Sequence, residues 1–459
     1  MTTKIKSFNP YNLELLGEVT SSTNRDVEQK VQDARTASNM WREIGVRKRV
    51  ELMREVYEKL WQRKEEIAKL DSQEMGFPIA QCREFNLGDG FRYFKWNLDN
   101  AEKYLSSEIT QEDNKTISTV YYEPRGVTAV IQPWNFPFCQ WSWGVVTSLL
   151  VGNTVIYKPS EEVPLSAKLL EEIINGCNLP KGILSFIYGD GKVGEYLVTQ
   201  NIDMIVFTGS IKTGKRLYKI ASEKFIPILL ELGGSAPGIV FADVDINSTV
   251  ETIFWQRFTN CGQTCDGLKR LIIHDTISEK LISLLKTKLE SSVLGDPLKE
   301  ETQFGPLVAE RQLILLESQV KDAVYKGAKI ITGGKRAKNL KGYFYEPTIL
   351  TDITSDMRVW QEEVFGPVLP IRTFKKESEA LDLANNTTFG LGSYLYTKDK
   401  SRTQRVASHL EVGMVSVNGA NYVLPMNPFG GYKTSGMGRE HGKYGFHELC
   451  NIKVIAINK

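Results

Sequence analysis

The stretch from residue 204 to 224 reads MIVFTGSIKTGKRLYKIASEK, and it decides the fold class of the chain. Residues 204–207 form a short apolar run typical of a buried strand, and residues 212–224 have the spacing of a helix. Thr208, Gly209 and Ser210 lie between them, where a backbone leaves a strand and enters a helix. A strand followed directly by a helix is the repeating unit of a parallel sheet.

The same unit recurs on both sides of this stretch. Apolar runs predict further strands at 127–131, 153–157 and 183–187. Apolar residues three and four positions apart predict helices at 164–178 and 193–199. This alternation predicts βαβ units in a doubly wound parallel sheet, which binds ligands at the carboxyl ends of its strands.

A second α/β domain is predicted beyond residue 235. Its predicted strands lie near 237–241 and 270–274, and its helices near 276–292, 308–326 and 376–385. Residues 24–70 are predicted to be helical. Residues 450–459 alternate as a terminal strand with no obvious partner nearby, and such a strand often pairs with a sheet edge of another subunit.

The composition is that of an ordinary globular enzyme or binding protein. The 459 residues are too many for one compact core and suggest two or three domains. A net charge of +2 on well-mixed charges argues against nucleic acid as a partner. The first residues lack the apolar core of a signal peptide, so we expect a cytoplasmic protein with no membrane partner.

Particular residues also argue against a membrane-spanning protein and against a disulfide-rich or metal-binding protein. The longest apolar stretch, 136–157, is interrupted by polar residues and glycine, so a buried helix, a turn and a strand explain it better than a membrane span. The six cysteines contain no CxxC pair and the four histidines are scattered, so we predict neither a disulfide framework nor a metal site.

The segment Phe258–Cys265, FTNCGQTC, carries the strongest chemical signal. Cys265 follows a Gly-Gln pair and has polar neighbours, which a plain core cysteine would not need. No histidine lies beside it in the sequence, which disfavours a cysteine-protease dyad. Cys261 precedes the Gly-Gln pair and is the alternative thiol.

Glu231 is the candidate general base. It follows the apolar run 226–230 and precedes two glycines, 34 positions before Cys265. A carboxyl group at a strand end, partly removed from water, would have a raised pKa suited to a base. A strand-end carboxylate in solvent, or one paired with a lysine, is an equal alternative on these residues alone.

Three other segments could bind a ligand. Phe207–Ser210 suits a pyrophosphate at a helix N-terminus, although capping by Ser210 alone explains it too. Lys158–Glu161 also follows a strand, and an acidic side chain there could bind ribose hydroxyls and repel a 2′-phosphate. In Pro133–Pro137, PWNFP, two prolines rigidify a loop whose Asn135 amide could stabilise an oxyanion.

Together these segments resemble the aldehyde dehydrogenase superfamily. Seven motifs stand in the family's order and spacing over almost the whole chain: PWNFP, KPSE, FTGS, ELGG, GQTC, EEVFGP and PFGGYKTSG. The resemblance implies an α/β fold, with a Rossmann-type cofactor domain at 1–105 and 124–232. It further implies an α/β catalytic domain at 233–436 and a small β oligomerisation element at 106–123 and 437–459, in a homodimer or homotetramer.

The resemblance also implies residue roles for the oxidation of a small-molecule aldehyde with NAD, or alternatively NADP, as cofactor. Cys265 would be the nucleophile, Glu231 the base that activates water, and Asn135 an oxyanion donor. The implied cofactor-binding residues are Trp134, Lys158, Ser160, Glu161, Gly209, Ser210, Leu232, Glu363 and Phe365. The implied substrate tunnel contains Gln140, Trp143, Thr259 and Phe429.

Some residues depart from the family pattern. Asp266 follows the nucleophile where a small uncharged residue is usual, and it would raise the pKa of the thiol unless it points away. A succinate-semialdehyde-dehydrogenase-like member remains one reading, although Thr259 stands where such members usually have an arginine. The alternatives are a CoA-acylating dehydrogenase, which Glu231 argues against, a catalytically silent cofactor-binding member, and a thiol hydrolase.

Overall fold

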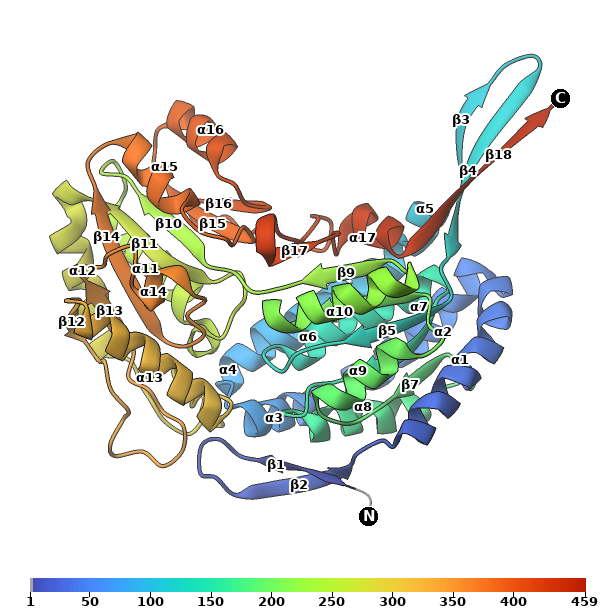
Figure 1. Ribbon diagram of the computed structural model, residues 1–459, viewed down its shortest axis with the longest axis horizontal. Helices are drawn as coiled ribbons and strands as arrows, with labels where there is room; N and C mark the ends of the chain where they lie inside the picture. Colours follow the sequence, from blue (N-terminus) through green and yellow to red (C-terminus); the bar gives the residue numbers. More distant parts are fainter. Residues whose placement is uncertain (1–2) are drawn as a thin grey trace.

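The computed structural model describes residues 3–459, which form two sheet-centred lobes and a projecting arm (Figure 1). The first sheet has the order β17-β9-β8-β5-β6-β7 and the second the order β12-β13-β14-β11-β10-β15-β16. The predicted fold class, α/β with parallel sheets, is confirmed.

The first sheet is parallel throughout except for β17 at one edge. Its members are β5 (Val127–Ile131), β6 (Thr154–Lys158), β7 (Leu184–Phe186), β8 (Met204–Thr208), β9 (Ile228–Glu231) and β17 (Gly436–Met437). Each strand that was predicted from the sequence in this sheet is found within one residue of its predicted ends.

Side chains of the first sheet alternate between two covered faces, as both faces of a parallel sheet require. Val127, Ala129 and Ile131 pack with α1 (Asn24–Glu43), α9 (Gly191–Thr199) and α10 (Ile211–Lys224). Val130 points to the opposite face of the sheet and packs there in a larger core. The helices that contribute to this core include α2 (Gly45–Gln62), α3 (Lys64–Met75), α5 (Asp89–Leu105), α7 (Thr147–Val151) and α8 (Pro164–Asn175).

Three neighbouring strands of this sheet end at one edge. The chain runs from β5 outward through β6 and β7, then returns to β8 and β9 on the other side of β5. The boundary between β5 and β8 is therefore the topological switch point, where ligands bind in such sheets. Asn135 follows β5, Ser210 follows β8 and Glu231 ends β9, so the topology alone brings these three residues together.

The second sheet is parallel except at β12. Its strands are β10 (Ala236–Val240), β11 (Leu268–His274), β12 (Lys329–Thr332), β13 (Thr348–Thr351), β14 (Val368–Phe374), β15 (Gly392–Tyr396) and β16 (Met414–Val417). Its helices are α11 (Ile246–Phe258), α12 (Asp275–Glu290), α13 (Glu310–Tyr325), α14 (Arg358–Gln361), α15 (Glu377–Asn385) and α16 (Lys400–His409). The connection 232–235 passes directly from β9 to β10, so it joins the two sheets next to Glu231.

The arm is a three-stranded antiparallel sheet with the order β18-β4-β3. Its strands are β3 (Glu108–Glu112), β4 (Thr116–Pro124) and β18 (Cys450–Asn458), and Figure 1 shows them extending beyond the helices. The terminal strand was expected to lack a nearby partner, and this expectation is wrong, because β18 pairs with β4 along its whole length. The local sequence pattern missed the pairing because more than 300 residues separate the two strands, although the family resemblance had grouped 106–123 with 437–459 in one β element.

Other element ends differ from the sequence predictions for local reasons. The helical region 24–70 is three helices, separated near Gly45, whose φ is 75°, and at Arg63. The predicted helix 164–178 ends at Asn175, before Gly176. The apolar stretch 136–157 forms α6 (Pro137–Trp141), a π-helical segment η2 (Ser142–Val146), α7 and β6, as predicted. Within residues 3–459, no helix is both long and apolar enough to cross a membrane.

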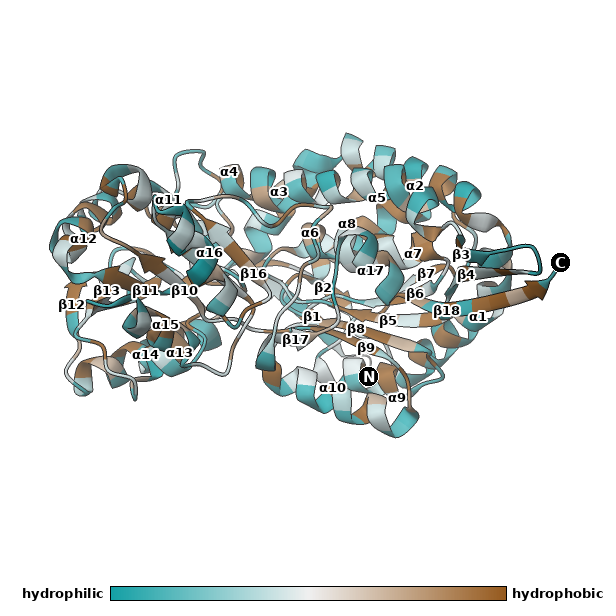
Figure 2. Cartoon of the chain, turned by 90° about the horizontal axis from the view of Figure 1, so that it is seen from above, coloured by the Kyte–Doolittle hydropathy of each residue, from teal (hydrophilic) through white to brown (hydrophobic). Residues whose placement is uncertain are grey.

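The remaining elements are short. They are β1 (Lys4–Phe8), β2 (Leu15–Thr20), α4 (Ile79–Gln81), η1 (Cys82–Gly88), η3 (Thr259–Gly262), η4 (Lys433–Ser435) and α17 (Gly442–Glu448). Figure 2 shows hydrophilic residues on the outward faces of the helices and hydrophobic residues along the central strands, as expected for sheets covered by amphipathic helices.

Candidate active site

The loop before Cys265 has an unusual backbone. Asn260, Cys261 and Gly262 have φ values of 52°, 55° and 73°, so three consecutive residues adopt the left-handed conformation. Non-glycine residues in this conformation cost free energy and persist only where surrounding contacts hold them. A Cβ on Gly262 would lie 2.5 Å from the carbonyl oxygen of Gly366, so the loop packs tightly on the segment that carries Glu363.

The two cysteines of FTNCGQTC have different surroundings. Cys261 is 1% exposed, its thiol donates to the carbonyl of Gly305, and burial raises its pKa to about 12. Cys265 instead lines two cavities. The geometry therefore favours Cys265 as the reactive thiol and gives Cys261 a structural role.

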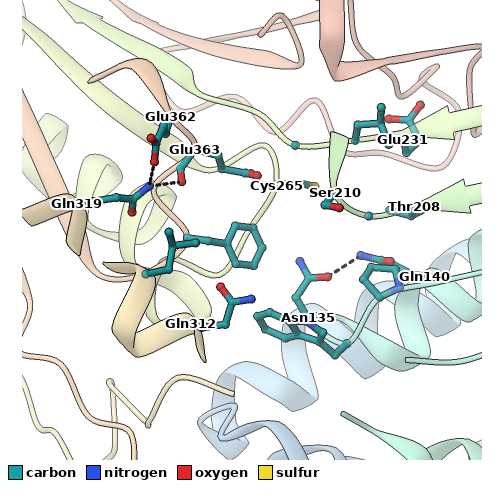
Figure 3. A pocket seen from close by; sticks show the side chains of 17 residues that line it. Asn135, Gln140, Thr208, Ser210, Glu231, Cys265, Gln312, Gln319, Glu362 and Glu363 are labelled. Carbon is teal, nitrogen blue, oxygen red and sulfur yellow. Dashed lines mark hydrogen bonds between the residues drawn. The ribbon is translucent and has the colours of Figure 1, made fainter. Parts of the chain in front are cut away.

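The two cavities meet at Cys265. One, of about 310 Å³, is lined by residues from both sheets, including Trp134, Asn135, Gly209, Ser210, Glu231, Leu232, Glu363 and Phe365 (Figure 3). The other, of about 480 Å³, is largely aromatic and contains Trp143, Thr259 and Phe429. Among residues 3–459, Gln140 and Cys265 are the two that line both cavities. Most residues with predicted cofactor roles thus line the first cavity, and the predicted tunnel residues line the second.

Asn135 is held at both ends of its side chain. Its Nδ2 donates to the backbone carbonyl of Gln263 over 3.0 Å, and its Oδ1 accepts from Nε2 of Gln140 over 3.0 Å. Asn260 donates to the backbone carbonyl of Asn135 over 2.8 Å. The strained loop and the PWNFP segment therefore position each other, and Nδ2 keeps a second hydrogen for a ligand.

Glu231 lies in the first cavity but does not contact the thiol. Its carboxylate is buried and, within the described chain, has no hydrogen-bond partner. A Cβ on Gly430 would lie 2.7 Å from Oε1, so the carboxylate faces the glycine-rich segment, and Figure 3 shows it apart from Cys265. Burial, followed by the nearby Glu440 carboxylate, raises the pKa of Glu231 well above its ordinary value.

The late segment PFGGYKTSG connects the two sheets around Glu231. Gly436 pairs with Glu231 in the β17–β9 ladder, and a Cβ on Gly436 would lie 2.1 Å from the carbonyl oxygen of Leu230. The Ser435 hydroxyl donates to the Gly233 carbonyl over 2.8 Å and accepts from the Gly390 N–H over 2.9 Å. This segment is therefore a structural clamp on the ELGG turn, rather than a plain flexible connection.

Glu363 lies at the junction of the two lobes. Its Oε1 accepts from the Gly234 N–H over 3.1 Å and from the fully buried Lys269 ammonium over 3.3 Å. Lys269 also lies 4.5 Å from the centre of the Phe365 ring. Arg257, close to Thr259 in the sequence, does not line either cavity and donates to backbone carbonyls of residues 364–368.

The predicted cofactor residues form a surface that fits a dinucleotide. Ser210 caps α10, a 14-residue helix whose first N–H groups can bind a phosphate, and Gly209 lines the cavity beside it. Trp134 and Phe365 meet edge to face, with ring centres 5.5 Å apart. Lys158 is buried, and its ammonium lies 3.4 Å from the half-exposed carboxylate of Glu161. Lys158, Ser160 and Glu161 lie beyond the first cavity, at the end of the next strand, β6.

Asp266 points toward the thiol rather than away from it. Its Oδ1 lies 4.0 Å from Sγ of Cys265, and its Oδ2 accepts from the Tyr422 hydroxyl over 3.1 Å. Burial raises the pKa of the Cys265 thiol well above its ordinary value, and the Asp266 carboxylate raises it further. The Lys269 ammonium acts in the opposite direction.

Several residues in the cavities carry no sequence signal that we recognised. Gln312 and Gln319 of α13 line the first cavity, and Gln319 donates to the Glu362 carboxylate over 3.0 Å. The second cavity also contains Glu84, Phe85, Asp89, Arg92, Trp255, Tyr394 and Tyr422. They lie outside the motifs, on helices, on β15 and in a loop, so only their packing reveals them. His441 lies behind this cavity, 4.4 Å from the Trp143 ring, and burial lowers its pKa to about 3.

Comparison with known proteins agrees with this architecture. Residues 1–455 match the aldehyde dehydrogenase family, and the chain belongs to that family. It is 36% identical over 464 residues to aminoaldehyde dehydrogenase 1 of Pisum sativum, covering 98% of this chain and 92% of the relative. It is 35% identical over 460 residues to betaine aldehyde dehydrogenase of Bacillus subtilis, covering 98% of this chain and 93% of the relative.

Solved structures give the same result. A crystal structure described as an E. coli NADP dependent enzyme superposes with a TM-score of 0.96 at 31% identity, covering 100% of this chain and 95% of the other. PnpE in complex with nicotinamide adenine dinucleotide superposes with a TM-score of 0.96 at 33% identity, covering 99% and 94%. The fold is therefore that of an NAD(P)-dependent aldehyde dehydrogenase.

Proposed function

We propose that the chain oxidises an aldehyde to the carboxylic acid through a covalent intermediate on Cys265. The observation that carries the proposal is the position of Cys265, which lines both the cavity with the dinucleotide-binding surface and the aromatic cavity. A thiol in that position can reach a carbonyl carbon held in one cavity while the hydride acceptor lies in the other.

The reaction begins at the sulfur atom. The Cys265 thiolate attacks the carbonyl carbon, and the oxygen takes up negative charge that the free hydrogen of Asn135 Nδ2 stabilises. NAD(P)⁺, when bound, supplies the acceptor for the hydride that leaves this carbon. Loss of the hydride converts the thiohemiacetal into a thioester on Cys265.

Glu231 completes the cycle in this proposal. Its carboxylate turns from the glycine-rich segment toward the thioester and takes a proton from a water molecule, which attacks the acyl carbon. The bond between carbon and sulfur breaks, the carboxylic acid leaves and the thiolate is restored. Burial and the Glu440 carboxylate raise the pKa of Glu231, so its carboxylate is a stronger base than an ordinary one.

NAD is the cofactor that we propose the chain prefers. Glu161 at the end of β6 would accept from ribose hydroxyls and repel a 2′-phosphate. The Glu363 oxygen Oε2, which is not used by Gly234 or Lys269, would accept from the second ribose. A relative crystallised with NAD supports this preference, and another described as NADP dependent shows that the family alone does not decide it.

The aromatic cavity favours a cationic aldehyde over one that carries a carboxylate. Its lining includes the acidic residues Glu84 and Asp266, whereas its basic residue, Arg92, is neutralised by Asp89 in an ion pair of 2.5 Å. Aromatic rings such as Trp143 and Tyr422 also attract cations. Relatives named aminoaldehyde and betaine aldehyde dehydrogenases are consistent with this choice, which argues against succinate semialdehyde.

Replacement of Cys265 tests the reaction. Cys265→Ala should abolish NADH formation with every aldehyde tried, while Cys261→Ala, the matched change at the structural thiol, should retain turnover in the fraction that folds. Turnover by the Cys265→Ala protein would refute the proposed nucleophile. Assays with and without CoA distinguish hydrolysis from acyl transfer, and calorimetric NAD binding without any turnover would indicate a silent member of the family.

Matched aldehydes test the substrate class. Trimethylammonioacetaldehyde and 3,3-dimethylbutanal have the same shape and differ in one positive charge. We expect at least about a tenfold higher kcat/KM for the cation, since a favourable charge contact of about 1.4 kcal/mol corresponds to that factor. Equal values for the pair, or a preference for succinate semialdehyde, would refute the cationic class and leave the proposed reaction unaffected.

A further inference from the structure

Gln140 is the residue, besides Cys265, that belongs to both cavities in the described part of the chain. It lies on α6, directly after the PWNFP segment, and its side chain is 3% exposed. Its Nε2 donates to Oδ1 of Asn135, and its backbone carbonyl accepts from the Gln132 side chain. Gln140 is therefore fixed on one side and reaches the proposed oxyanion donor on the other.

The hydrogen bonds determine which way the Asn135 amide faces. The backbone carbonyl of Gln263 can only accept, so the end of Asn135 that lies 3.0 Å from it must be the nitrogen. The other end is then the oxygen, which needs a donor, and Nε2 of Gln140 supplies one over 3.0 Å. The two hydrogen bonds therefore have one consistent direction of donation, from Gln140 to Asn135 and from Asn135 to Gln263.

A flip of the Asn135 amide would place Oδ1 against the Gln263 carbonyl and would present the cavity with an acceptor instead of a hydrogen. Two oxygens in contact repel each other, and a buried polar group without a partner destabilises the folded state. Gln140 opposes this flip because its Nε2 can donate to an oxygen but not to an NH₂ group. Its own Oε1 is buried and has no partner within residues 3–459, so no competing contact explains its orientation.

The next layer of residues supports the same arrangement. Gln132 follows β5, and a Cβ at Gly144 would lie 2.7 Å from the Gln132 amide nitrogen. A larger residue at position 144 would displace Gln132 from the Gln140 carbonyl. The absence of a side chain at Gly144 therefore leaves room for the hydrogen bonds that connect Gln132 to Gln140 and Gln140 to Asn135.

We propose that Gln140 is a positioning residue, which keeps the Asn135 amide turned so that its free hydrogen faces the oxygen of the reacting aldehyde. The proposal rests on the proposed function, because it gives Asn135 the role of oxyanion donor. Gln140 itself acts through Asn135. Loss of Gln140 should therefore slow the chemical step and leave the affinity for the cofactor unchanged.

A double-mutant cycle with the full-length protein tests this inference. The measured quantities are the rate of the first turnover of NADH and the Kd of NAD. Asn135→Ala should slow the first turnover about 100- to 1000-fold, as loss of an oxyanion donor does. Gln140→Met, which has similar length but no donor, should slow it about 10- to 100-fold with Kd unchanged within about twofold. The double variant should be no slower than Asn135→Ala alone.

The conservative variant Gln140→Glu adds a readout that a packing defect would not give. A carboxylate cannot donate to Asn135, whereas a carboxylic acid can. The ratio of the Gln140→Glu rate to the wild-type rate at the same pH should therefore rise as the pH falls. If the Gln140→Met protein does not fold, Gln140→Leu and Gln140→Glu take its place in the cycle.

The outcomes separate this inference from the function on which it rests. A wild-type first-turnover rate for Gln140→Met would overturn the role of Gln140. So would a double variant that is slower than Asn135→Ala by the same factor by which Gln140→Met alone slows the wild type. A flat pH ratio for Gln140→Glu would do the same. A wild-type rate for Asn135→Ala would instead overturn the proposed oxyanion donor, and with it the mechanism.

Discussion

Cys265 lies between charges of opposite sign, and this balance is the chemically distinctive feature of the site. Asp266 Oδ1 lies 4.0 Å from its sulfur, while the buried Lys269 pairs with Glu363 on the other side. The Asp266 carboxylate, followed by that of Glu363, opposes formation of the thiolate, and the Lys269 ammonium favours it. The reactivity of the thiol therefore depends on residues one and four positions after it in the sequence.

Neutralising Asp266 should make the thiol more reactive. Two unit charges 4 Å apart repel each other by about 1 kcal/mol even in water, which is about a fivefold change in the thiolate population. The pKa of Cys265 should fall in Asp266→Asn, so iodoacetamide should alkylate it about five times faster at neutral pH. Alkylation of the variant and the wild type at the same rate across the pH range would contradict this.

Glu440 should affect deacylation through Glu231. Burial, and then the Glu440 carboxylate, raise the pKa of Glu231, and burial raises the pKa of Glu440 to about 8. A base works when deprotonated, so deacylation should increase as the pH rises through the pKa of Glu231. Glu440→Gln removes a like charge, lowers that pKa and should move the increase to lower pH.

The control for this pH experiment is Glu231→Gln. It should let the thioester accumulate, with a normal first turnover of NADH and at least about a hundredfold slower steady state. A steady-state rate that is normal in Glu231→Gln would remove the base from the mechanism. An unchanged pH profile in Glu440→Gln would show that the two carboxylates do not interact.

At the scale of elements, local sequence predicted most of the fold. Strand–turn–helix units such as 204–224 are short-range patterns, and their ends were found within a few residues. Local patterns did not predict the pairing of β18 with β4, which only the family resemblance implied. They also did not predict the direction of the Glu231 carboxylate or the bond from Asn135 to Gln263. Each depends on segments that are distant in the sequence, and a spacing pattern carries no information about their packing.

The arm leaves apolar residues in water on both faces of β18. Ile452, Val454 and Ile457 are 63%, 62% and 56% exposed, and Figure 2 shows the brown, hydrophobic strand at the end of the molecule. A single chain rarely exposes such a continuous apolar edge, and a second subunit would cover it. We therefore retain the prediction that the chain forms a homodimer or homotetramer through this arm.

A charge on the arm should disrupt the assembly. Val454→Asp should reduce the mass measured by light scattering during size-exclusion chromatography, with unchanged helical content. Phe225→Asp is the matched control, because Phe225 is 97% exposed at the C-terminal end of α10, outside the arm. An oligomer that survives Val454→Asp, or a wild-type protein that is monomeric, would exclude the arm as the interface.

At the scale of the whole molecule, the cavity proposed to bind the dinucleotide is built from both lobes. Asn135, Ser210 and Glu231 come from the first sheet and its loops, whereas Cys265 and Glu363 come from the second lobe. A ligand that contacts both lobes stabilises them relative to the unfolded chain. It therefore links the two folding units as well as completing the site.

NAD should raise the thermal unfolding temperature. At a concentration one hundred times its Kd, a ligand adds about 2.7 kcal/mol to the free energy of unfolding, which corresponds to a few degrees. Differential scanning fluorimetry should show a larger shift with NAD than with NADP at equal concentration. Cys265→Ala should keep the shift, since it removes the nucleophile and not the binding surface. A larger shift with NADP would contradict the role given to Glu161.

The junction of the two cavities also has a consequence for inhibition. Within the described chain only Gln140 and Cys265 line both, so a compound that fills the aromatic cavity leaves the other cavity open. For the proposed reaction, such a compound competes with the aldehyde and leaves cofactor saturation unaffected. A bisubstrate compound that carries a nicotinamide mimic and an aryl group on one short linker would occupy both volumes at once, with its linker lying across the sulfur of Cys265.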